Sequence, residues 1–274
     1  MRSLPGLKRV LIASVGFLVV LIGFVVFFYR DAVIAPYYGK TSNLVHYEQQ
    51  DAGANRDFYI MGTIHAMHFT KKYNYAIAEI KSVIDTLEPD LILVEVRQET
   101  VDQYGALDGP IDMIYAWCYA KEKNIDVKGI DYWSPAPGVR SNSTDDTRDD
   151  KLFENVLLAG KEGGKILVVC GAQHRINFRQ RFINAGYRKP GISNIGNYFG
   201  HYDAEHFHYP DSMAEEITKK IEWANSGFVE EVKSLNAPDT EDYNFWMNNT
   251  AALVESLEKQ LKDFVIPGKL YGQQ

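Results

Sequence analysis

The residues of this chain best suited to chemistry follow a repeated pattern, in which an apolar run ends in glycine, two residues and histidine. "FYIMGTIH" ends at His65, and "ILVVCGAQH" ends at His174. Glycine tolerates positive φ and close approach of another backbone, so each histidine should lie directly beyond a strand end. Ligands of an open α/β sheet bind at that end. Two neutral imidazoles there suit a divalent metal, which needs a carboxylate as third ligand and an open position for water.

Glu95, in "LILVEVRQ", is the obvious carboxylate for such a site. An ionised group inside so apolar a strand costs several kcal/mol unless a cation or a metal compensates it. Arg97 lies two residues further on, which on a strand is the same face. One interpretation is therefore a Glu95–Arg97 ion pair with no further role. The other is a metal held by His65, His174 and Glu95.

Five short motifs between residues 62 and 174 together resemble the TraB/PrgY/TIKI family, also called the TraB/GumN domain. They are "GTIH", "LVEVR", "GIDYW", "TRDDKL" and "GAQH", in this order. The family is marked by two Gly-x-x-His motifs, a glutamate after an apolar strand, and an Arg-Asp pair that opens a later helix. The likeness covers roughly residues 45 to 235, and the paired motifs around the glutamate make it fairly specific.

The resemblance assigns site roles residue by residue. His65 and His174 would be the metal-site histidines and Glu95 their acidic partner. Arg148 and Asp149 would be the supporting pair at the start of a helix. The resemblance also includes the motif "GID". Asp131 in this motif would be a further member of the site.

The TIKI branch implies a membrane-tethered, metal-dependent protease whose fold resembles the erythromycin esterase and ChaN domains. A divalent Mn, Co or Zn ion would then activate a water and polarise the scissile carbonyl of a peptide or protein substrate. Arg97 or Arg148 would stabilise the oxyanion, and Asp131 or Asp149 would orient an imidazole or accept a proton. PrgY, a bacterial member, restrains a peptide pheromone. The alternative is therefore a catalytically silent binder or regulator of a small peptide or haem-like ligand.

The N-terminal segment predicts a membrane anchor. Residues 10 to 29 form an apolar run without a charge, long enough to cross a hydrocarbon layer about 30 Å thick. More positive charge precedes the run than follows it, so residues 1 to 9 should stay in the cytoplasm and the rest should face the periplasm or the extracellular space. A cleaved signal peptide is the competing interpretation, but the run exceeds its usual length. Animal TIKI proteins differ, because their tether follows the domain.

The remaining chain, residues 43 to 266, alternates apolar strands with amphipathic helices. This alternation predicts one α/β domain with a central mixed β-sheet covered by helices. "NLVHYE" and "DFYIMG" should form a hairpin, and "DLILVEV", "IDVKGI" and "GGKILVVC" should be strands. Helices are expected over residues 77 to 87, around 111 to 118, after "STDDTRDD" and from 174 to 185. Two or three more should fill the C-terminal third.

Composition excludes some other functions. The 274 residues carry a net charge of −7 with both signs mixed, so the chain lacks the basic stripe that a nucleic-acid partner would need. Both cysteines lie in apolar settings and should be buried thiols. His68 is expected at the surface. His206 and His208 are expected in an exposed edge strand or loop rather than in a metal site.

Overall fold

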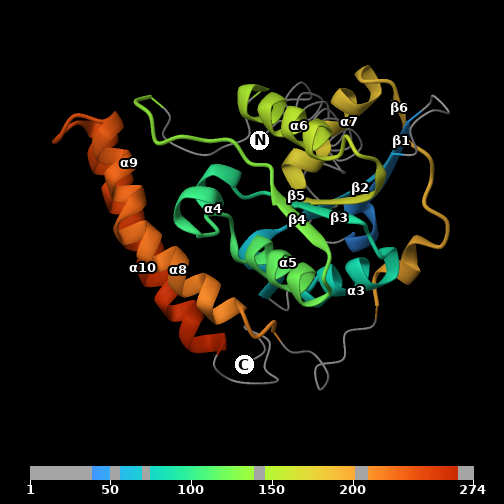
Figure 1. Ribbon diagram of the computed structural model, residues 1–274, viewed down its shortest axis with the longest axis horizontal. Helices are drawn as coiled ribbons and strands as arrows, with labels where there is room; N and C mark the ends of the chain where they lie inside the picture. Colours follow the sequence, from blue (N-terminus) through green and yellow to red (C-terminus); the bar gives the residue numbers. More distant parts are fainter. Residues whose placement is uncertain (1–38, 50–55, 70–74, 139–145, 201–208, 265–274) are drawn as a thin grey trace, which may run out of the picture.

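The computed structural model describes residues 39–49, 56–69, 75–138, 146–200 and 209–264 (Figure 1). These residues form an α/β fold, in which helices flank a six-stranded mixed sheet of order β4-β3-β5-β2-β1-β6. The strands are β1 (Leu44–Gln49), β2 (Arg56–Thr63), β3 (Leu91–Val94), β4 (Asp126–Gly129), β5 (Gly164–Gly171) and β6 (Tyr187–Arg188). The predicted fold class, a mixed sheet covered by helices, is confirmed.

The helices described follow in chain order. They are α3 (Ala78–Leu87), α4 (Gln98–Tyr104), α5 (Ile111–Glu122), α6 (Asp146–Ala159), α7 (Ala172–Asn184), α8 (Met213–Asn225), α9 (Gly227–Leu235) and α10 (Glu241–Phe264). Three 3-10 helices accompany them, namely η2 (Lys40–Asn43), η3 (His65–Phe69) and η4 (Ile195–Tyr198). Two or three helices were expected near the C-terminus, and residues 209–264 form α8, α9 and α10.

Pairing within the sheet agrees with the sequence pattern except at one strand end. The predicted hairpin is confirmed, because β1 and β2 pair antiparallel, while β4, β3, β5 and β2 are parallel neighbours. β3 is shorter than expected. It ends at Val94, because the backbone N–H of Val96 turns back to the carbonyl of Val94. Glu95 therefore lies just beyond the strand and not within it.

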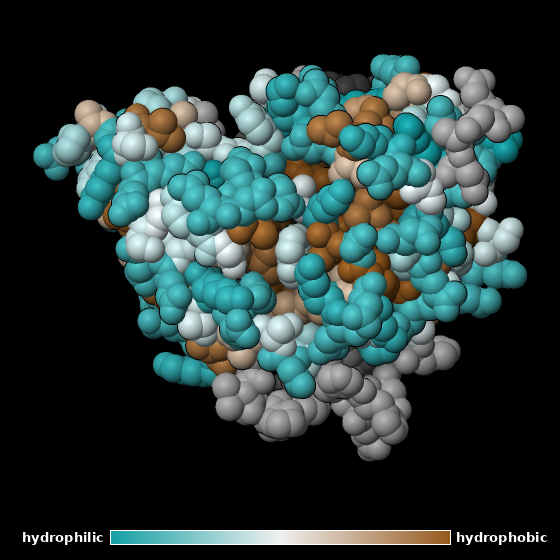
Figure 2. All heavy atoms as spheres, viewed as in Figure 1, coloured by the Kyte–Doolittle hydropathy of each residue, from teal (hydrophilic) through white to brown (hydrophobic). Residues whose placement is uncertain are grey.

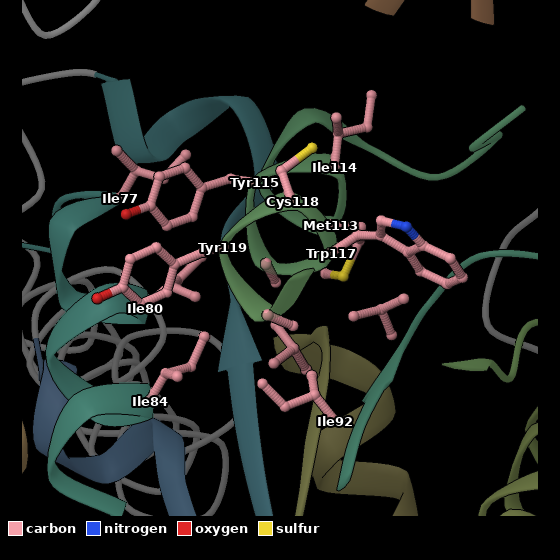
Figure 3. Close-up of a cluster of buried hydrophobic side chains, with 14 of the residues drawn as sticks. Ile77, Ile80, Ile84, Ile92, Met113, Ile114, Tyr115, Trp117, Cys118 and Tyr119 are labelled. Atoms are coloured by element: carbon pink, nitrogen blue, oxygen red, sulfur yellow. The ribbon is translucent and has the colours of Figure 1, made fainter. Parts of the chain in front are cut away.

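Each face of the sheet packs against its own pair of helices. On one face, Ile80 and Ile84 of α3 point toward Tyr115 and Tyr119 of α5, above Ile92 of β3 (Figure 3). On the other face, the aromatic side chains of α6 and α7 pack on β2 and β5. Because both faces are covered, the central strands are apolar along their whole length. A separate aromatic cluster joins α8, α9 and α10.

The connections reverse direction at the carboxyl ends of the strands. After β5 the chain enters α7 on one face, whereas after β2 and β3 it continues to α3 and α5 on the other face. β5 lies between β2 and β3 in the sheet. Such a reversal is where open α/β sheets bind ligands.

The surface in Figure 2 is mainly hydrophilic, with apolar side chains visible over the central strands. The predicted anchor over residues 10 to 29 lies outside the described residues. Among the helices that are described, none is long and apolar enough to span a membrane.

Substitution of Ile80 by alanine should test the α3 packing. Ile80 is fully buried in the cluster with α5, so Ile80→Ala should lower the free energy of unfolding by about 2–5 kcal/mol, measured by urea denaturation of the full chain. Leu158→Ala is the matched control, because Leu158 on α6 is 66% exposed. It should change stability by less than about 0.5 kcal/mol. Equal effects of the two substitutions would contradict this packing.

Candidate active site

Four parallel strands each deliver a polar residue just beyond their carboxyl ends. His65 follows β2, Glu95 follows β3, Asp131 follows β4, and His174 lies in the first turn of α7 after β5. β2 and β5 are parallel neighbours in which Thr63 pairs with Gly171, so the two Gly-x-x-His motifs lie side by side. All four site residues therefore come from one edge of the sheet, as the spacing of the motifs predicts.

Gly171 lets the two motifs meet at Glu95. A Cβ at Gly171 would lie 2.9 Å from His65 Nε2 and 3.4 Å from Glu95 Oε2, so a larger residue would displace the imidazole. The backbone N–H of Gly171 donates to Glu95 Oε2 at 2.6 Å. Its φ is −55°; the glycine is needed for close approach and not for positive φ.

Glu95 is a buried carboxylate surrounded by cations. Its Oε1 lies 3.2 Å from His174 Nε2 and accepts a hydrogen bond from Arg148 at 2.9 Å. Burial raises the pKa of Glu95, but His174, His65 and Arg148 outweigh burial and lower that pKa well below its usual value. Glu95 is therefore held ionised within the protein.

A carboxylate holds the Nδ1 atom of each site histidine. His65 Nδ1 lies 3.2 Å from Asp112 Oδ2, and His174 Nδ1 pairs with the carboxylate of Asp149. Burial lowers the pKa of each imidazole, but these acids and Glu95 raise it to about 9. Nε2 of His174 then faces Glu95, and Nε2 of His65 lies close to Gly171. Carboxylates orient metal-binding histidines through Nδ1 in this way.

The backbone at His65 adopts a conformation that non-glycine residues rarely take. His65 has φ of 52° at the start of η3, which is the left-handed region. Such backbone strain clusters at functional sites. The conformation turns the chain sharply after β2, and the imidazole then lies beside Gly171.

Arg148 links two acids of the site from the beginning of α6. Its Nε and Nη2 donate to the two oxygens of Asp131, at 3.0 and 2.8 Å, and Nη2 also reaches Glu95. Burial and the nearby Glu95 raise the pKa of Asp131, although Arg148 opposes this. Asp131 and Arg148 therefore lie together beside Glu95, and Asp149 joins them through His174.

Arg97 is not brought into this cluster. Its guanidinium donates to Asp108 at 2.5 Å and to both oxygens of Glu231, and it lies 4.0 Å over the ring of Trp133. The interpretation in which Arg97 pairs with Glu95 is therefore wrong, and Arg97 does not join Glu95 as the predicted site residue either. That interpretation assumed that residues 95 and 97 lie on one face of a strand. The turn around Val96 ends the strand, so the two side chains point in different directions.

Two further site neighbours were not anticipated. Asp112 is fully buried at the start of α5, and its charge within the apolar run "IDMIYAWC" is the signal that could have revealed it.

His68, expected at the surface, is instead buried. Its Nε2 accepts from the N–H of Ile64 at 3.0 Å, and its Nδ1 donates to the carbonyl of Tyr75 at 2.8 Å. These two bonds require the neutral tautomer.

A second group of possible metal ligands lies on the β1–β2 hairpin. His46, Glu48 and Asp57 are half-buried, and among the described residues they form the group whose three ligand atoms lie within 4.8 Å of one another. His65, His174 and Glu95 do not reach that spacing. His46 Nε2 already contacts Asp57 at 3.1 Å, and Glu48 pairs with Arg188. The charged side chains of this group thus already have partners in His46 and Arg188. His206 and His208 lie outside the described residues.

Comparison of the chain with known proteins adds no family assignment. No protein-family model matches it. No curated protein and no solved structure matches it either. The resemblance to the TraB/PrgY/TIKI family therefore depends on the motifs at residues 62 to 174 and stays a prediction.

Buried His68 predicts a loss of stability in mild acid. Burial lowers its pKa to about 4, whereas in the unfolded chain the imidazole should titrate near about 6.5. Between these values the unfolded state binds one proton more, so the free energy of unfolding should fall as pH falls from about 6.5 to about 4. Urea denaturation across this range should show a shallower fall for His68→Gln. Identical slopes for the two chains would contradict a neutral His68.

Proposed function

We propose that this chain is a metal-dependent hydrolase that cleaves a peptide or protein. The observation that supports this most directly is that His65 and His174 are each held by a buried carboxylate at Nδ1, while Nε2 of His174 lies 3.2 Å from Glu95. Membership of the TraB/PrgY/TIKI family, with an erythromycin esterase/ChaN-like fold, is part of the proposal. The order of the motifs and the mixed sheet support it.

The donor set fits a divalent ion. Ligand bonds of about 2.0–2.2 Å place neighbouring ligand atoms roughly 3 Å apart, and His174 Nε2 lies 3.2 Å from Glu95 Oε1. His65 Nε2 and Glu95 Oε2 both lie close to Gly171, and His65 would move closer to Glu95 and His174 to become the third ligand. A bound Mn, Co or Zn ion would supply a water of lowered pKa and would polarise the scissile carbonyl.

The remaining residues have separate tasks in this proposal. Asp112 and Asp149 hold the imidazoles in place through Nδ1. Arg148 presents a guanidinium beside Glu95, where it would stabilise the oxyanion. Asp131 has its pKa raised toward the working range of a general base and would accept the proton of the attacking water. Arg97 has no part, because its donors are directed to Asp108 and Glu231.

One observation favours the alternative, a catalytically silent binder or regulator of a small peptide or haem-like ligand. Glu95 is fully hydrogen-bonded by Gly171, Arg148 and His174 without an ion. Arg148 donates to the same Oε1 atom that a metal would need. In a silent protein this ion pair would be permanent, and the histidines would serve the structure alone.

Metal analysis separates these two functions. The purified full chain should bind Mn, Co or Zn in a one-to-one ratio, and His174→Ala and His65→Ala should each abolish this binding. Asp149→Asn should weaken metal affinity about 10- to 100-fold, because it removes the group that orients His174. His46→Ala is the matched control on the hairpin and should bind normally. Equal metal content in all of these chains would refute the site.

Peptidase assays with the same metals then test hydrolysis. Cleavage of a mixed peptide library should require added metal and should be lost in His174→Ala. If the parent chain binds metal at His65 and His174 yet cleaves no peptide, the hydrolase proposal is wrong and the site binds metal without hydrolysis.

We also propose that residues 10 to 29 anchor the domain in the membrane with residues 1 to 9 in the cytoplasm. A tag at the C-terminus should then be accessible to protease on intact cells or spheroplasts, and a tag at the N-terminus should be protected until the membrane is opened. The reverse pattern would place the domain in the cytoplasm.

A further inference from the structure

A separate pocket lies beside the candidate site. It has a volume of about 490 Å³ and is enclosed by α4, the segment after β4 and α9. This volume is within the range of about 300–1,000 Å³ that is typical of ligand pockets. Its walls include Glu99, Tyr104, Tyr132 and Glu230, with Arg97 at the base.

The pocket carries unbalanced negative charge. Arg97 contributes one positive charge, but its ion pairs with Asp108 and Glu231 more than balance it. Glu99 and Glu230 also line the pocket. Both are exposed, and within the described part of the chain neither makes an ion pair. A ligand entering the pocket would therefore meet free carboxylates.

Two aromatic rings of the pocket are also available to a ligand. Tyr132 is 47% exposed and Tyr104 is 39% exposed. Tyr104 is packed against Gly227, where a Cβ would lie 2.5 Å from its ring. This contact holds Tyr104 in place at the pocket wall. Aromatic faces together with carboxylates form the environment that binds organic cations.

The pocket and the candidate active site share the loops that follow β3 and β4. Tyr132 directly follows Asp131, whose carboxylate binds Arg148. The backbone N–H of Asp131 also donates to the carbonyl of Val96 at 2.9 Å, and this bond ties the loops after β3 and β4 together. The two loops that carry Glu95 and Asp131 of the candidate site thus also carry Arg97 and Tyr132 of the pocket.

We propose that this pocket binds the lysine or arginine side chain of a peptide, and thereby makes the protein selective for substrates with a basic residue near the scissile bond. The second part rests on the proposed hydrolase function. The first part does not, because it depends only on the charge and the rings of the pocket.

Binding of charged and neutral peptides to the full chain tests the pocket. The probe is acetyl-Gly-Arg-Gly-amide, and its control carries citrulline, which has the same shape without the charge. By isothermal titration calorimetry the arginine peptide should bind about tenfold more tightly, from the combined ion-pair and ring contributions. Equal affinity for the two peptides would overturn the proposal.

Substitutions of the pocket residues test whether the preference for arginine arises in this pocket. The double variant Glu99→Gln/Glu230→Gln should abolish the preference for arginine over citrulline, and Tyr132→Ala should reduce it. The double variant Glu255→Gln/Glu258→Gln removes the same charge from the exposed face of α10, so it should keep the preference. A preference that is unchanged by the pocket variants, or lost equally in the α10 variant, would refute this location.

The same peptides distinguish this inference from the proposed function. His174→Ala should lose peptide cleavage but retain the tenfold preference in binding. If no chain cleaves any peptide while the preference persists and depends on Glu99 and Glu230, the hydrolase proposal fails and the binding pocket stands.

Discussion

The structure depends most on how the buried charge of Glu95 is compensated. A carboxylate taken out of water needs several strong partners, and Glu95 has a backbone N–H from Gly171, a guanidinium from Arg148 and an imidazole from His174. These partners come from β5, α6 and α7, so one charge joins elements far apart in the sequence. Removal of any partner would leave the carboxylate underbonded in the interior.

The sheet explains why these partners can meet. Four parallel strands end at one edge, and the chain leaves β5 toward one face but β2 and β3 toward the other. The first turns of α5 and α6 then supply Asp112 and Asp149, which hold the two imidazoles. The same arrangement serves either a metal-binding site or a metal-free ion-pair network. Only the proton or ion between His174 and Glu95 differs between the two.

Arg97 shows that the loop after β3 serves two regions. Glu95 turns into the site, whereas Arg97 turns outward to Asp108 and Glu231 and fastens α9 to the α/β layers. Its stacking on Trp133 forms the base of the neighbouring pocket. The candidate site and the pocket are thus coupled through a single short segment of backbone.

The sequence by itself determined the α/β class, the hairpin, the strand ends before His65 and His174, and the helical character of the C-terminal third, because these follow from local periodicity and glycine positions. Only the tertiary structure decided the partners. Strand alternation placed Arg97 beside Glu95, but a turn at Val96 reversed its direction. Asp112 lies 47 residues from His65, and no local pattern links them. Pairing between distant charges is set by how the helices pack on the sheet, and a linear sequence does not display that packing.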